Sequence, residues 1–68
     1  MKYELTDVSN IESKEHKHIG EVNEFSFNGD YFTFGTIRSS RVFLIKSYKQ
    51  FLEVVTKNSV YTFTQISN

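Results

Sequence analysis

Two neighbouring runs of alternating aromatic and polar residues form the clearest pattern in the chain. The runs 21–27 and 30–37 flank Asn28-Gly29, a dipeptide that tolerates the positive φ angles of a type I′ turn. With that dipeptide as the turn, Phe25 lies opposite Phe32. We therefore predict a β-hairpin whose four phenylalanines share one face.

A second hairpin is predicted directly after the first. Segment 38–41, Arg-Ser-Ser-Arg, forms its turn, and 41–46 is rich in β-branched and aromatic residues. Pairing across this turn places Phe34 opposite Ile45 and enlarges the phenylalanine face. The expected core is Phe25, Phe32, Phe34, Phe43 and Ile45.

The next segment has features of both a helix and a strand. Its apolar residues recur at the spacing of one helical face: Tyr48, Phe51, Leu52 and Val55. Ser47 and Gln50 have the spacing of a capping box, and Asn58 suits a left-handed C-cap. A run of β-branched residues, Val-Val-Thr, favours a strand instead. Because the end signals agree with the period, we predict a helix over 48–57.

The two ends of the chain complete the predicted architecture. Residues 2–8 read as a first strand, 9–18 as a loop or a single helical turn, and 59–66 as a last strand at the sheet edge. The expected fold is α+β: a strongly bent antiparallel sheet of about five strands in meander order, with one short helix. The alternative is an all-β small barrel, SH3-like or OB-like, if 51–56 is a strand.

The composition limits what such a fold can be. The chain has 68 residues, with seven Phe, four Tyr, no Pro and no Cys. We expect one domain over 1–68 that the aromatics stabilise, because no disulfide or thiolate metal site is available. No stretch approaches the roughly 20 apolar residues of a membrane span, and the first residues lack a signal-peptide pattern. We therefore expect a soluble, cytoplasmic protein without a membrane partner.

Charge is unevenly divided along a chain whose formal net charge is zero. Residues 1–30 hold seven acidic and three basic residues, a net −4, whereas residues 31–68 hold five basic and one acidic residue, a net +4. Whether this asymmetry survives in space depends on how the strands interleave.

Residue types that carry catalysis or bind metals are sparse. His16 and His18, with Glu12 and Glu15 nearby, are the only cluster of metal-ligand types, and the spacing fixes no third ligand. We expect these histidines to be solvated, with no metal and no cofactor. The sequence has no nucleophile motif and no glycine-rich phosphate loop, so we expect no enzyme activity.

Basic and aromatic residues interleave in the C-terminal half. The candidate binding residues are Arg38, Arg41, Lys46, Lys49, Tyr31 and Tyr61. Basic side chains that clamp phosphates beside rings that stack on bases are typical of single-stranded nucleic-acid binding. In the predicted register Arg38 and Arg41 face one another, which suits an anion between them. Segments 29–35 and 41–45 resemble the aromatic strand pair of cold-shock and other OB-type domains, although Asp30 stands where such motifs carry a base.

These observations favour a small non-catalytic module that binds another protein. The absence of a catalytic constellation, a semi-apolar second sheet face and the zero net charge all agree with this function. A chain of this size, without Ala or Pro and rich in residues with AT-rich codons, is typical of a phage or mobile-element regulator or inhibitor that acts on a host protein. A homodimer through the semi-apolar face or through strand 59–66 is a further expectation. The alternative function is single-stranded nucleic-acid binding.

Overall fold

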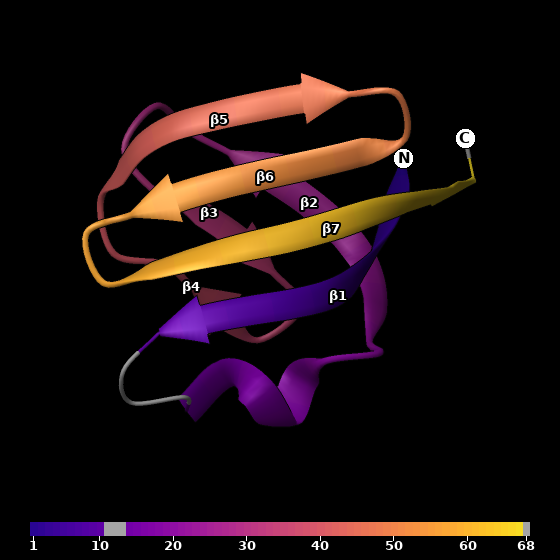
Figure 1. The fold of residues 1–68 in the computed structure, drawn as a ribbon, viewed down its shortest axis with the longest axis horizontal. Coiled ribbons are helices and arrows are strands. Elements are labelled where there is room, and N and C mark those ends of the chain that lie inside the picture. The colour runs from indigo at the N-terminus through magenta and orange to yellow at the C-terminus, as the bar shows by residue number, and fades with distance from the viewer. Residues whose placement is uncertain (11–13, 68) are drawn as a thin grey trace.

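The chain folds almost entirely into β-strands. The computed structural model describes residues 1–10 and 14–67 and contains, within them, seven strands and one 3-10 turn (Figure 1). The elements are β1 (Lys2–Asn10), η1 (Lys14–His18), β2 (Val22–Phe27), β3 (Phe32–Phe34), β4 (Ile37–Arg38), β5 (Val42–Tyr48), β6 (Phe51–Thr56) and β7 (Ser59–Ser67). The predicted α+β class is therefore wrong, because the described residues form no α-helix.

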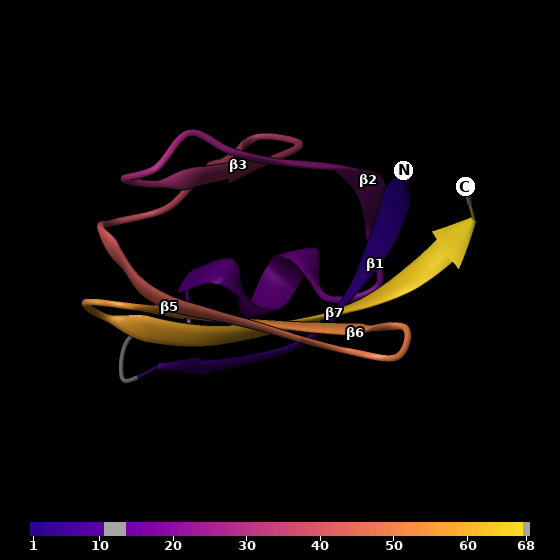
Figure 2. The ribbon, with the colours of Figure 1, turned by 90° about the horizontal axis from the view of Figure 1, so that it is seen from above.

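The strands form one antiparallel sheet in the order β4-β3-β2-β1-β7-β6-β5. Strands β1 to β4 are one meander, strands β5 to β7 are another, and the long β1–β7 ladder joins them. Strand β2 bends the sheet, since its first half pairs with β1 and its second half with β3. Figure 2 shows the result, a layer with β3 lying over a layer formed by β5, β6, β7 and β1.

The bent sheet does not close into a barrel. Strands β4 and β5 are its two edges and do not pair with each other, although only residues 39–41 separate them in sequence. The Val42 N–H donates to the Asp30 carbonyl at 2.7 Å and ties the start of β5 to the opposite layer. The alternative prediction of an all-β fold is thus right about the strands. It is wrong about the barrel, because the sheet of the described residues is open.

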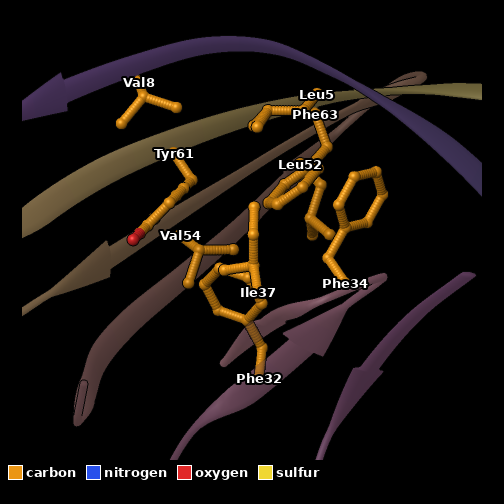
Figure 3. Close-up of a cluster of buried hydrophobic side chains, with 9 residues drawn as sticks. All are labelled: Leu5, Val8, Phe32, Phe34, Ile37, Leu52, Val54, Tyr61 and Phe63. Carbon is orange, nitrogen blue, oxygen red and sulfur yellow. The ribbon is translucent and has the colours of Figure 1, made fainter. Parts of the chain in front are cut away.

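The space between the layers is filled mainly by aromatic rings. Figure 3 shows Phe32 and Phe34 pointing from the β3 layer toward side chains of the other layer. The Phe63 ring is the centre of this cluster. Its centroid lies 4.9 Å from that of Phe34, 5.2 Å from that of Phe25 and 5.6 Å from that of Phe32. The buried apolar residues are Leu5, Val8, Phe32, Phe34, Ile37, Leu52, Val54, Tyr61 and Phe63.

The segment predicted as a helix over 48–57 comprises the last residue of β5, the turn at 49–50, strand β6 and the residue after it. Residues 49–50 and 57–58 are turns, and between them Leu52, Val54 and Thr56 alternate into the interior. The apolar residues at helical spacing do not share a face in the structure. Leu52 faces the core, whereas Tyr48 and Phe51 pair on the outer face. Ladders with β5 and β7 satisfy both edges of this β-branched segment, so tertiary pairing overrides the local helix signals.

The first predicted hairpin exists with a different register. Asn28 opens a four-residue loop, because its Oδ1 accepts hydrogen bonds from the Asp30 and Tyr31 N–H groups at 2.9 and 3.0 Å. Phe25 therefore pairs with Phe34 instead of Phe32. The slip is two residues, and because side chains alternate with a period of two, the phenylalanines keep their predicted face.

The second predicted hairpin is wrong. The chain instead turns at Gly35-Thr36, between β3 and β4, where Gly35 has a φ of +59° and Phe34 pairs with Ile37. Strand β5 consequently leaves this layer and pairs with β6, so Phe43 is 64% exposed instead of buried. Of the expected core, Phe32 and Phe34 are fully buried and Phe25 and Ile45 pack against the core.

The N-terminal strand is confirmed and runs two residues beyond the predicted 2–8. Segment 59–66 is a strand too, but β7 lies between β1 and β6 and is not an edge. Dimerisation by pairing through that strand is therefore ruled out in this fold. No helix in residues 1–10 and 14–67 is long and apolar enough to cross a bilayer.

Candidate functional site

Large apolar side chains gather on the outside of the β5–β6 hairpin. Phe43 is 64% exposed and Tyr48 68%, while Leu44 and Phe51 are also exposed. A register shift between Val42 and Leu44 explains the adjacent pair at 43–44, since the extra residue of a bulge lets two consecutive side chains stay outside. We call these four residues, Phe43, Leu44, Tyr48 and Phe51, the hairpin patch.

The strand register arranges the outer face in cross-strand rows. Leu44 lies opposite Val55, and Val55 lies opposite Val60, which makes an aliphatic row. Tyr48 and Phe51 form a second apolar row at the other end of the hairpin. A charged row separates the two.

That charged row contains an ion pair between the two strands. Lys46 Nζ lies 3.8 Å from Glu53 Oε1, and both side chains are largely in solvent. An exposed pair of this length stabilises the fold by little, so Lys46 is free to exchange its partner. On the outer face, apolar side chains therefore lie on both sides of Lys46, whose ammonium group can pair with an acid of a partner.

Strand β5 also has a free backbone edge, because β6 is its only ladder partner in the described chain (Figures 1 and 2). Two hydrogen bonds show which backbone groups of the β6 segment face each neighbouring strand. The Lys57 N–H donates to the Arg41 carbonyl before β5, and the Gln50 carbonyl accepts from the Gln65 N–H of β7. The odd-numbered residues of β6 thus face β5. In an antiparallel pair this directs the N–H and C=O groups of Ile45 and Ser47 away from the sheet.

The tip of the hairpin is a strained turn. Tyr48 pairs with Phe51, so Lys49 and Gln50 form a two-residue loop, and Lys49 has a φ of +53°. This is a conformation that residues other than glycine rarely adopt. Lys49 Nζ lies 5.4 Å from the centroid of the Tyr48 ring, which places a cation beside the exposed aromatic side chain.

The predicted binding residues separate into three places. Arg41, Lys46 and Lys49 lie on or beside β5, close to the hairpin patch. Arg38 lies on β4 and pairs with Thr33 of β3. It does not face Arg41, whereas the predicted register placed the two arginines opposite one another. Its guanidinium instead lies over the Tyr31 ring, 4.2 Å from the centroid.

Tyr61 lies in a different environment from the other predicted binding residues. It is 4% exposed, and its ring packs edge-on against Phe32 at 4.9 Å. Contact with a ligand would require this ring to leave the core.

Two acidic residues of the N-terminal half, Glu4 and Asp7, lie away from the β5 edge. Strand β7 has no charged residue and separates the acidic residues Glu4 and Asp7 of β1 from the β5–β6 hairpin. Strands β1 and β5 are three strand spacings apart, about 14 Å. At physiological ionic strength the Debye length is about 8 Å, so Glu4 and Asp7 do little to cancel the field of the cations along β5. Asp30, whose carbonyl accepts a hydrogen bond from the Val42 N–H, is the acidic residue beside the start of that strand.

The two histidines make contacts within the fold. His16 Nε2 lies 2.6 Å from the Val8 carbonyl, and His18 Nδ1 lies 2.7 Å from Glu21 Oε2. Glu12 and the side chain of Glu15 lie outside the described residues. The residues that are described contain no group of three or more His, Cys, Asp or Glu that could hold a metal ion.

Sequence reasoning overlooked the exposed hairpin patch. Phe43 was predicted in the core, and Phe51 on a helical face. The alternation of Leu52, Val54 and Thr56 was the local signal for the strand that forms here.

Comparisons with models of protein families, with curated proteins and with solved structures find no match to this chain.

Proposed function

We propose that this chain is a non-catalytic protein-binding module and that the hairpin patch is its contact surface. The observation that carries the proposal is the concentration of four exposed large apolar residues on one hairpin. Exposed apolar side chains on both sides of a charged pair are typical of protein interfaces, which combine apolar contacts with polar ones. A regulator or inhibitor that acts by covering a surface of a larger protein would use such a patch.

The make-up of the patch favours a protein partner over a nucleic acid. Single-stranded nucleic acids need aromatic faces for stacking, beside phosphate clamps. The hairpin patch is partly aliphatic, since Leu44 continues into Val55 and Val60. Of the two candidate stacking rings from the sequence, Tyr61 is buried and Tyr31 is covered by Arg38.

The proposal is tested by affinity capture with immobilised protein and paired variants. We expect the wild-type chain to retain a partner after nuclease treatment, and the double variant Tyr48→Ser with Phe51→Ser to lose it. Val22→Ser is the control, because Val22 is 47% exposed, close to the 43% of Phe51, but lies on β2 away from the hairpin patch. Loss of the partner with nuclease, or equal capture by the double variant, would contradict the proposal.

A further inference from the structure

We infer that the free edge of β5 receives an acidic, extended segment of a partner protein as an eighth strand of the sheet. This inference rests on the proposed function and adds to it the chemistry and the geometry of the partner. Three features of the hairpin carry it: the unpaired backbone edge, the charge along it and the side chains beside it.

The first feature is that β5 is the longer of the two strands that end the sheet in the described part of the chain. Edge β4 has two residues, Ile37–Arg38, whereas β5 has seven. The N–H and C=O groups of Ile45 and Ser47 point away from β6, as the alternation along the hairpin requires. An added strand would satisfy these groups, and this is how extended peptides join exposed sheet edges.

The second feature is the sign of the charge along this edge. Strand β5 has one charged residue, Lys46, and it is flanked by Arg41 before the strand and Lys49 after it. On the neighbouring strand Glu53 is the one acid, and it lies in the exposed ion pair with Lys46. An acidic segment laid along β5 would meet three cations and could replace Glu53 as the partner of Lys46.

The same charges decide against a second copy of this chain. Pairing β5 with β5 of another copy would bring the cations of two acid-free strands together, and like charges at sheet edges oppose association. Strand β1 of a second copy, which carries Glu4 and Asp7, pairs with β7 along its length and with β2 only over residues 2–4. Beyond that ladder its backbone bonds to the segment before β2, through the Leu5 N–H and carbonyl and the Val8 carbonyl, so it does not offer a free edge like that of β5.

The third feature is the apolar surface on which the side chains of the added strand would lie. Leu44 and Tyr48 project on the outer face on either side of Lys46. A segment in which apolar and acidic residues alternate therefore matches this face, since alternate side chains of a strand share one side of the sheet.

Nuclear magnetic resonance titration with synthetic peptides tests the inference. The probes are a short peptide of alternating valine and glutamate and a matched peptide of alternating valine and lysine. We expect the glutamate peptide to shift the amides of β5, to weaken as salt rises, and to bind at least about tenfold more tightly than the lysine peptide. Equal binding of the two peptides, or no shift of β5 amides by either, would overturn the inference.

A proline substitution separates edge pairing from binding to the outer face. Ser47→Pro removes an N–H that faces the free edge and leaves the ladder to β6 intact, and proline is tolerated at such positions. We expect Ser47→Pro to abolish peptide binding and Ser47→Ala, which keeps the N–H, to retain it. Unfolding of Ser47→Pro would be seen in the same spectra, and Lys46→Glu then serves as the second test, with the glutamate peptide expected to lose affinity.

The outcomes distinguish this inference from the proposed function. If the captured protein partner is lost with Tyr48→Ser and Phe51→Ser but kept by folded Ser47→Pro, the hairpin patch binds protein and strand addition is wrong. If sedimentation shows a dimer that Ser47→Pro dissociates, a second copy occupies the edge and the acidic segment is wrong. If a single-stranded oligonucleotide shifts the β5 amides and the glutamate peptide does not, both proposals fail.

Discussion

Gly35 lies against the side-chain amide of Asn23, so closely that a Cβ at position 35 would be 2.7 Å from Asn23 Nδ2. Gly35 also has a φ of +59° in the tight turn between β3 and β4. The backbone conformation thus favours a glycine at the β3–β4 turn, and a Cβ there would also displace the Asn23 amide of the neighbouring part of β2.

Gly35→Ala should destabilise the fold by more in the wild-type background than in an Asn23→Ala background. The positive φ costs a residue with a Cβ about 1–2 kcal/mol in both backgrounds, and the contact with the Asn23 amide adds to this cost only where the amide is present. Chemical denaturation of Gly35→Ala in the two backgrounds measures the difference. In an Asn23→Ala background the extra cost of Gly35→Ala should disappear, and its persistence there would show that the amide contact is not its cause.

Lys49→Gly should stabilise the protein. Lys49 has a φ of +53° at the tip of the β5–β6 hairpin, and glycine relieves this strain. We expect a gain of about 0.5 kcal/mol in the free energy of unfolding, after the higher entropy of glycine in the unfolded chain is subtracted. Gln50→Gly is the control, because the φ of Gln50 is not positive, and it should destabilise. A loss of stability in Lys49→Gly would contradict the turn geometry.

Thr56→Val should loosen the turn between β6 and β7. The buried Thr56 Oγ1 accepts hydrogen bonds from the Asn58 and Ser59 N–H groups at 3.3 and 3.0 Å and donates one to the Ser59 carbonyl at 3.1 Å. Valine keeps the volume but removes these three hydrogen bonds, at about 1–3 kcal/mol. Thr56→Ser keeps the hydroxyl and should cost less in thermal unfolding. The reverse order would mean that the methyl group matters more than the hydrogen bonds.

Phe34→Ala and Phe43→Ala should differ sharply, although both residues were expected in the core. Phe34 is fully buried against Phe63, so its truncation should cost about 3–5 kcal/mol, enough to unfold a domain of this size. Phe43 is 64% exposed, and its truncation should change stability by less than about 0.5 kcal/mol. Circular dichroism melts of both variants check the layer assignment of β5. A folded Phe34→Ala protein with an unfolded Phe43→Ala protein would reverse it.

Salt dependence should separate the protein-binding proposal from the nucleic-acid hypothesis. Four phosphate contacts by Arg38, Arg41, Lys46 and Lys49 would make log K fall with log salt at a slope of about −3. Arg38 is engaged on Tyr31, and Arg41 lies at the β5 end of the 39–41 link, so we expect no oligonucleotide binding that survives physiological salt. A slope near −3, lost in a folded Arg38→Glu with Arg41→Glu variant, would favour nucleic acid.

The sequence alone determined that segments 2–8, 22–27 and 59–66 are extended and that Phe25, Phe27, Phe32 and Phe34 share a face, whereas Phe43, predicted on the same face, is exposed. Alternation with a period of two is a local property, so it is independent of which strand lies alongside. For this reason Phe25 and Phe34 kept their shared face even though the Asn28 loop moved the register by two residues.

Tertiary structure decided the partner of each strand, and with it the candidate site. Segment 48–57 has signals of both helix and strand, and only the ladders from β5 and β7 select the strand. The turn at Gly35-Thr36 ends the first meander early and sends β5 to the far edge of the other layer. Phe43 is exposed because of that long-range pairing and the local bulge. Strand pairing depends on residues distant in sequence, so local periodicity could predict a strand at β5 but not that its edge and its aromatic side chains are free.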